Sequence, residues 1–210
     1  MLEVNTPHTG LLRLGLVLPQ SVIFWERAAE ETAVKALQDQ AVAQQWFDGL
    51  SDTRTRYIIG QLSKRFPFEA RRALAFGEGL EPHQAQLRCH WHLQLTDPIY
   101  RRFTSEYLFN CWTSPHASVE LEGVITWVSG LPLAKDWKKV TVRRMGSGLL
   151  SAATEAGLCQ GSGKKEKALR VPRVEPEDRD YLRNLLSQAE ASASLSLYLR
   201  SVGQSMEESE

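Results

Sequence analysis

Cysteine is scarce and unpatterned in this sequence. The three cysteines, Cys89, Cys111 and Cys159, are an odd number among 210 residues and have no close spacing. A disulfide framework requires paired cysteines and an oxidising compartment. We therefore expect buried or half-buried free thiols in a reducing compartment.

Long apolar runs are also missing. The longest one near the start, residues 11–18, contains Arg13 and ends before Pro19, far short of the roughly 20 apolar residues of a membrane-spanning helix. A secretory signal would begin with a basic segment, whereas Glu3 stands at this position. These absences predict a cytoplasmic protein that makes no membrane contact.

Motifs of catalysis are absent from the sequence as well. It has no Gly-rich phosphate loop, no catalytic serine elbow and no internal repeat of 20 to 50 residues. Two acidic pairs, Glu30 with Glu31 and Glu120 with Glu122, are typical of solvated helix faces rather than of a general acid and base. We expect no enzymatic activity, no cofactor and no small-molecule substrate.

A loose set of cysteines and histidines is the nearest approach to a metal site. Its members are Cys89, His90, His92, Cys111 and His116. Their spacing matches no familiar pair of zinc ligands, and adjacent residues of a helix point in different directions. Cys89 with His92 could act as nucleophile and base, but no third group that would orient the base is recognisable. Ordinary core and surface side chains are the favoured interpretation.

Apolar residues recur at spacings of three and four along most of the chain, which indicates amphipathic helices. Prolines stand at the expected beginnings of several of them. Ser51 or Asp52, Asp97 and Asp136 are expected N-caps, and Gly157 is an expected C-cap. The glycines at 146 and 148 are expected to bend or divide one helix. The predicted helices cover residues 19–30, 32–45, 52–66, 67–76, 82–95, 98–112, 118–130, 136–145, 149–156, 177–186 and 195–199. The fold class predicted is all-α, a compact multi-helix bundle.

The predicted organisation is one domain over residues 1–200. Residues 10–134 form a helical body, and residues 135–190 add a basic helix, an extended arm and a C-terminal helix. The Gly161-Ser162-Gly163 turn between that helix and the extended residues 168–174 resembles the turn of a wing. Residues 201–210 are expected to fray.

Charge is balanced overall but not along the chain. The sequence has 25 basic and 25 acidic residues, so its net charge is zero. Residues 135–173 nevertheless carry 10 basic and 3 acidic side chains, a net charge of +7, and residues 174–210 carry 3 and 8, a net charge of −5. A basic segment therefore precedes an acidic end.

Basic side chains concentrate in three groups, which can neutralise the phosphates of a nucleic acid. The candidate nucleic-acid-binding residues are Arg54, Arg56, Lys64, Arg65, Lys135, Lys138, Lys139, Arg143, Arg144, Lys164, Lys165, Lys167 and Arg170, with Arg71, Arg72 and Arg173 beside them. Trp137, among the lysines of the second group, is a candidate stacking platform. Alternatively, these cations pair with the acidic end or an acidic partner, or solvate their helices.

Two segments resemble the BrxA family, components of the bacterial BREX phage-exclusion systems. Residues 15–21 read Gly-Leu-Val-Leu-Pro-Gln-Ser, similar to the family's N-terminal signature. Residues 141–145 read Thr-Val-Arg-Arg-Met, where the family has a Ser-Thr-Arg-Arg-Lys pattern, and Glu-Ala-Gly-Leu at 155–158 resembles the end of the same segment. Val142 and Met145 depart from the pattern, and Gly146 and Gly148 interrupt a helix that is continuous in the family. The resemblance extends over about residues 10–190.

This resemblance implies a small helical protein likened to the NusB antitermination fold. It also implies DNA binding without catalysis, beside other BREX proteins in phage defence. It transfers no catalytic residue, and only Arg143 and Arg144 of the candidates lie in a family motif.

Three hypotheses follow from the sequence. The first is sequence-independent binding of duplex DNA through phosphates. The second is a protein-protein adaptor of the same defence system that does not bind DNA. The third is an RNA-binding antitermination-like factor, which rests on the analogy of fold alone.

Overall fold

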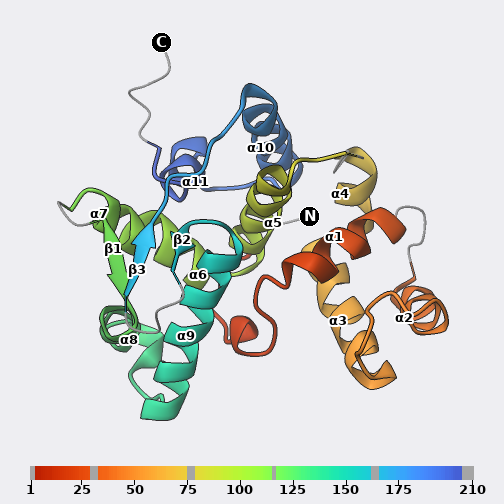
Figure 1. The fold of residues 1–210 in the computed structure, drawn as a ribbon, viewed down its shortest axis with the longest axis horizontal. Coiled ribbons are helices and arrows are strands. Elements are labelled where there is room, and N and C mark those ends of the chain that lie inside the picture. Colours follow the sequence, from red (N-terminus) through yellow and green to blue (C-terminus); the bar gives the residue numbers. More distant parts are fainter. Residues whose placement is uncertain (1–2, 29–32, 75–78, 115–116, 162–165, 205–210) are drawn as a thin grey trace.

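The computed structural model describes residues 3–28, 33–74, 79–114, 117–161 and 166–204, and these form a mainly helical body with one small sheet (Figure 1). The α-helices are α1 (Leu18–Arg27), α2 (Val34–Ala43), α3 (Asp52–Arg65), α4 (Phe68–Ala73), α5 (Pro82–Thr96), α6 (Pro98–Arg102), α7 (Phe109–Trp112), α8 (Leu121–Ser129), α9 (Lys139–Glu155), α10 (Pro176–Gln188) and α11 (Leu195–Arg200). Short 3-10 turns are η1 (Gly10–Leu12) and η3 (Pro132–Ala134), and the π-helical η2 (Phe103–Leu108) joins α6 to α7.

Helix α5 lies at the centre of the fold. Residues 87–95 are all buried, because α1, α3, α6 and α10 pack around them. The helix begins at Pro82 with a capping box between Glu81 and Gln84. The Asp97 side chain then caps α6 by accepting hydrogen bonds from the backbone N–H groups of Ile99 and Tyr100. The predicted cap followed by proline is confirmed here.

The first four helices form one side of the molecule (Figure 1). Their predicted positions are confirmed within a few residues, including the Ser51 cap, whose Oγ accepts from the N–H of Arg54 at 3.3 Å. The ring of Trp25 meets that of Phe66 edge-on at 5.1 Å between centroids, which ties α1 to the end of α3. Among the helices of the described ranges, none combines the length and the apolar character required to cross a membrane.

A three-stranded antiparallel sheet departs from the all-α prediction. It consists of β1 (Ser118–Glu120), β2 (Cys159–Gln160) and β3 (Glu166–Leu169), with β3 in the middle. The prediction of helix at residues 118–120 was wrong, because the buried Val119 pairs with Lys167 of β3. Pairing with a strand far along the chain outweighs the helix propensity of these residues.

Helix α9 is continuous, whereas the sequence predicted that the glycines at 146 and 148 bend or divide it. Its N-cap is Lys138 rather than Asp136. A Cβ atom at Gly146 would lie 3.0 Å from Cγ1 of Ile125, so the glycine lets α8 approach and does not bend α9. Gly157 has φ +76° and ends the helix as predicted, since its N–H donates to the carbonyl of Thr154.

The packed part of the chain extends past residue 200. Ser201 and Val202 are buried against the core, so the predicted frayed tail does not begin at residue 201. Residues 205–210 lie outside the described ranges.

Candidate nucleic-acid interface

Helix α9 has one buried face and one exposed face. Val142, Met145 and Leu149 point into the core. Val140, Arg144 and Ser147 are exposed on the opposite face, since helical residues spaced by three and four positions share a side. The apolar stripe of the helix thus fixes which basic residues reach the surface.

Neighbouring elements hold α9 in a defined orientation. The Glu155 carboxylate accepts a hydrogen bond from the N–H of Leu18 at 3.2 Å, and the Glu155 carbonyl accepts from Nε2 of Gln86 at 3.1 Å. Arg143 lies 3.2 Å from the Glu122 carboxylate on α8. The exposed face therefore belongs to a helix fixed by α1, α5 and α8 rather than to a free segment.

An open hollow lies between α9 and the N-terminal turn η1. It has a volume of about 320 Å³ and is lined by Leu11, Leu12, Val140, Arg143, Arg144, Ser147 and Gly148. Three of these lining side chains are aliphatic and two are arginines. Arg13 directly follows Leu11 and Leu12 of this lining and is exposed. In the sequence it stands inside an apolar stretch, and nothing there indicated that η1 would contact α9.

The segment before α9 adds further cations. Lys135, Lys138 and Lys139 are exposed, and Trp137 is half-buried against the core. Lys138 and Lys139 stand at the N-terminus of the helix, where the helix dipole also favours anions. What we call the α9 basic surface consists of Lys135, Lys138, Lys139, Arg143 and Arg144. All five of these sequence-predicted residues are exposed, and Lys139, Arg143 and Arg144 lie on α9.

Strands β2 and β3 follow α9 as a hairpin. The exposed Arg170 comes directly after β3, and Nζ of the half-buried Lys167 donates to the carbonyl of Gly161 at 2.9 Å. Lys164 and Lys165 lie outside the described residues. The order strand, helix, helix, strand, strand with β3 central resembles the connectivity of winged helix-turn-helix units, although residues 130–138 make a longer connection than their usual turn.

Comparison with known proteins supports the fold. A crystal structure of an uncharacterized protein from Magnetospirillum magneticum superposes with a TM-score of 0.67, covering 94% of this chain and 98% of that chain at 11% sequence identity. A likeness at this identity shows the shared fold alone. No protein-family model matches the sequence, and no curated protein matches it.

The α3 cluster is dispersed by the fold. Arg65 is buried, and its guanidinium donates to the carbonyls of Leu16 and Gly15 at 2.8 and 2.9 Å. Its predicted place on a basic surface is therefore corrected. Arg56 pairs with Asp39, and Arg54 stacks over the ring of Tyr57 at 5.2 Å. Lys64 is exposed, so α3 presents fewer free cations than its sequence suggests.

The arginines after α3 are likewise divided. Arg71 is buried, donates to the carbonyl of Phe66 at 2.9 Å and lies over the ring of Phe24. Arg72 and, after the hairpin, Arg173 are exposed, and Arg173 forms an ion pair with Glu175.

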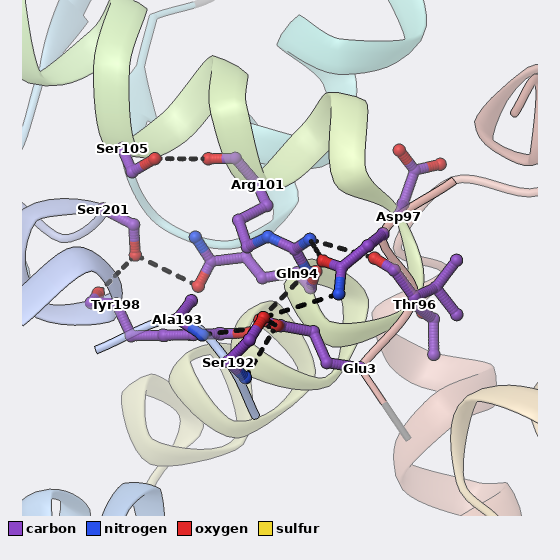
Figure 2. Close-up of polar contacts among 12 residues, drawn as sticks. Glu3, Gln94, Thr96, Asp97, Arg101, Ser105, Ser192, Ala193, Tyr198 and Ser201 are labelled. Atoms are coloured by element: carbon purple, nitrogen blue, oxygen red, sulfur yellow. Dashed lines mark hydrogen bonds and ion pairs between the residues drawn. The ribbon is translucent and has the colours of Figure 1, made fainter. Parts of the chain in front are cut away.

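A buried polar network joins the two ends of the chain, and sequence reasoning missed it (Figure 2). The Glu3 carboxylate lies 3.3 Å from the Arg101 guanidinium and accepts from the Tyr198 hydroxyl at 2.7 Å. It also accepts from the hydroxyl of Ser192 at 2.7 Å. Burial acts to raise the pKa of Glu3, but these hydrogen bonds and the charge of Arg101 outweigh it and lower the pKa.

This network is structural in character. Both carboxylate oxygens of Glu3 are engaged, and Arg101 also donates to the carbonyls of Gln94 and Val4 at 2.8 and 2.9 Å. A single Glu at position 3 and an Arg in a short helix carry no pairing signal in the sequence, because their contact depends on the closure of the whole fold.

The two buried histidines of α5 contact hydroxyl groups. His90 lies 2.9 Å from the hydroxyls of both Tyr100 and Ser201, and Nε2 of His92 lies 2.8 Å from the hydroxyl of Tyr181. Burial lowers the pKa of each histidine to about 3 and raises the pKa of the Cys89 thiol to about 12. Within the described part of the chain, no group of three or more metal-binding side chains converges; His116 lies outside it.

Proposed function

We propose that this chain is a non-catalytic DNA-binding accessory component of a BREX-type phage defence system. The observation that carries the proposal is the α9 basic surface, a set of exposed cations on a fixed helix followed by a hairpin. Such cations neutralise phosphates and release counterions. Membership of the BrxA family, likeness to the NusB fold and a cytoplasmic location belong to the same proposal and rest on the sequence resemblance and composition.

The arrangement supports duplex DNA as the partner. The major groove admits an α-helix, and a hairpin beside that helix can lie along the neighbouring backbone. The hydrogen bonds that hold Glu155 keep α9 in place before binding, so little conformational entropy is lost on contact. Phosphate contacts then supply most of the affinity.

The test is fluorescence anisotropy with labelled duplex DNA and RNA over a salt series. The test variant carries Lys138, Lys139, Arg143 and Arg144 changed to alanine. A matched control removes the same number of positive charges elsewhere, at the exposed Arg27, Lys35, Arg102 and Arg183. Circular dichroism and thermal melting establish that both variants are folded.

We expect the test variant to lose duplex affinity by roughly tenfold or more at low salt. The slope of log affinity against log salt concentration should also become shallower, by an amount that corresponds to about three fewer counterions released. The control should lose much less. Equal losses of duplex affinity in both variants would show that binding depends on the total charge of the protein and not on the α9 basic surface. Absence of any duplex binding at low salt would leave the adaptor hypothesis, to be pursued by co-purification from native cells. Preferential binding of RNA would favour the antitermination-like factor.

The defence assignment has its own test. Deleting the coding region from the native cells should raise the plating efficiency of phages that the system excludes. The wild-type chain should restore phage exclusion, and the test variant with four alanines should not. Unchanged plating after deletion would separate this protein from phage defence, whatever its DNA affinity.

A further inference from the structure

An apolar side chain stands in the middle of the α9 basic surface. Val140 is 61% exposed and lies in the first turn of α9, next to Lys139 and one turn before Arg144. A β-branched residue is a poor helix former, and most of this side chain lies outside the core packing. Folding stability therefore gives little reason for valine here.

The side chains around Val140 form a chemically mixed row. Val140, Arg144 and Ser147 follow the exposed ridge of the helix and line the hollow beside η1. Arg143 is drawn toward α8 by its ion pair with Glu122, whereas no ion pair of Arg144 with another described residue is present. The outward ridge thus offers methyl groups, a planar fork of donors and a hydroxyl.

These three groups match base edges better than they match phosphates. In the major groove, thymine exposes its C5-methyl group and guanine exposes two acceptors that arginine can bind bidentately. Serine can bond to any base, and residues in the N-terminal half of a recognition helix are those that reach base edges. An isopropyl group makes no favourable contact with a phosphate, so a surface used only for phosphates has no use for Val140.

We infer that α9 reads base sequence in the major groove, with Val140 contacting a thymine methyl group and Arg144 contacting a neighbouring guanine. This inference rests on the proposed DNA-binding function. It departs from the sequence-based expectation of binding independent of base sequence. Specific recognition adds to the phosphate contacts of Lys138 and Lys139, which hold the helix in register.

The first experiment selects binding sites from a library of duplexes with a randomised centre, using the full-length protein. We expect an enriched site that contains thymine and guanine and binds about tenfold or more tightly than a scrambled duplex of equal length and composition. Arg144→Ala should remove most of this preference. Val140→Ala removes two methyl groups, one of which is expected to be buried against the thymine. It should therefore weaken binding to the selected site about fourfold, while leaving the scrambled duplex unaffected.

The second experiment removes the methyl group from the DNA. Replacing the contacted thymine by deoxyuridine should weaken wild-type binding by a similar factor and should not weaken the Val140→Ala variant further. The control is Val34→Ala, which removes another exposed valine, on α2, and should change neither affinity.

The outcomes separate the two claims. Tight, salt-dependent binding with equal affinity for all duplexes would overturn base reading and leave the proposed function in place. A selected site whose affinity is insensitive both to Val140→Ala and to deoxyuridine would overturn the thymine contact. Absence of duplex binding would remove the proposed function and this inference with it.

Discussion

Helices α3 and α9 are both rich in cations, and the fold uses them in opposite ways. On α3, Arg65 turns inward to backbone carbonyls and Arg56 pairs with Asp39. On α9, Lys139 and Arg144 point away from the core. The difference follows from the apolar stripe, since Arg65 follows Ile58 and Leu62 at helical spacing on the buried face of α3. A basic cluster therefore predicts a surface only after its members are placed relative to this stripe.

The largest effect is expected from acid, which should destabilise the buried core beside the end of α3. The ring of Phe66, at the end of α3, packs against His92 at 4.9 Å between centroids. Burial lowers the pKa of His92 and His90 to about 3, below the ordinary value of about 6.5. Both histidines are neutral in the folded protein and take up protons on unfolding, so their stabilising effect is present above pH 6.5 and is lost as the pH falls toward 3.

We expect the free energy of unfolding to fall by up to about 1.4 kcal/mol per pH unit for each histidine. Urea denaturation between pH 7 and 5 measures this slope above the range in which most carboxyl groups titrate. His90→Gln and His92→Gln should each reduce the slope, even though each lowers stability at neutral pH. A slope unaffected by both substitutions would show that these rings do not take up protons on unfolding.

The second largest effect is expected from Arg65→Ala. Loss of the guanidinium leaves the carbonyl of Gly15 without this donor and removes one of two donors to the carbonyl of Leu16, which also accepts from Ser21. Stability should fall by about 2–4 kcal/mol, measured by chemical denaturation. The neighbouring and exposed Lys64→Ala is the control and should change stability by less than about 0.5 kcal/mol.

Duplex affinity separates the two possible roles of Arg65. At a temperature where the Arg65→Ala protein is folded, its affinity for DNA should equal that of the wild type. A stable variant with weakened DNA binding would instead place Arg65 at the interface and erase the contrast between the two helices.

Local signals in the sequence were sufficient for most helices and for part of the candidate interface. Proline beginnings, side-chain caps and apolar periodicity located α1 to α5, and charge clustering found Lys138, Lys139 and Arg144. The predicted extended segment at residues 168–174 overlaps β3. Its pairing with β1 was missed because Val119 needs a partner in β3, and no local pattern reports a pairing of that range. The hollow beside α9 was missed for the same reason, since η1 reaches it only through the folding of the whole N-terminal segment.

The two glycines of α9 give a smaller and opposite pair of effects. Gly146→Ala places a Cβ 3.0 Å from Ile125, whereas Gly148→Ala places one 3.8 Å from Leu11, an ordinary contact distance. We expect Gly146→Ala to destabilise by about 1–2 kcal/mol through overpacking and Gly148→Ala to stabilise by about 0.5–1 kcal/mol through helix propensity. Thermal melting of the two variants checks both signs. Stabilisation by both would mean that α8 and α9 do not approach closely at Gly146.

The smallest effect is expected from Arg56→Ala. The ion pair with Asp39 is partly exposed on both sides, and such pairs contribute about 0–1 kcal/mol. A double-mutant cycle with Asp39→Ala measures this coupling. Because Arg56 is already neutralised by Asp39, its removal should alter duplex affinity by less than about twofold at low salt, while Arg144→Ala should weaken binding several times more. If the two substitutions weakened duplex binding equally, α3 would contact DNA as α9 does, and charge clustering in the sequence would have been the better guide to the interface.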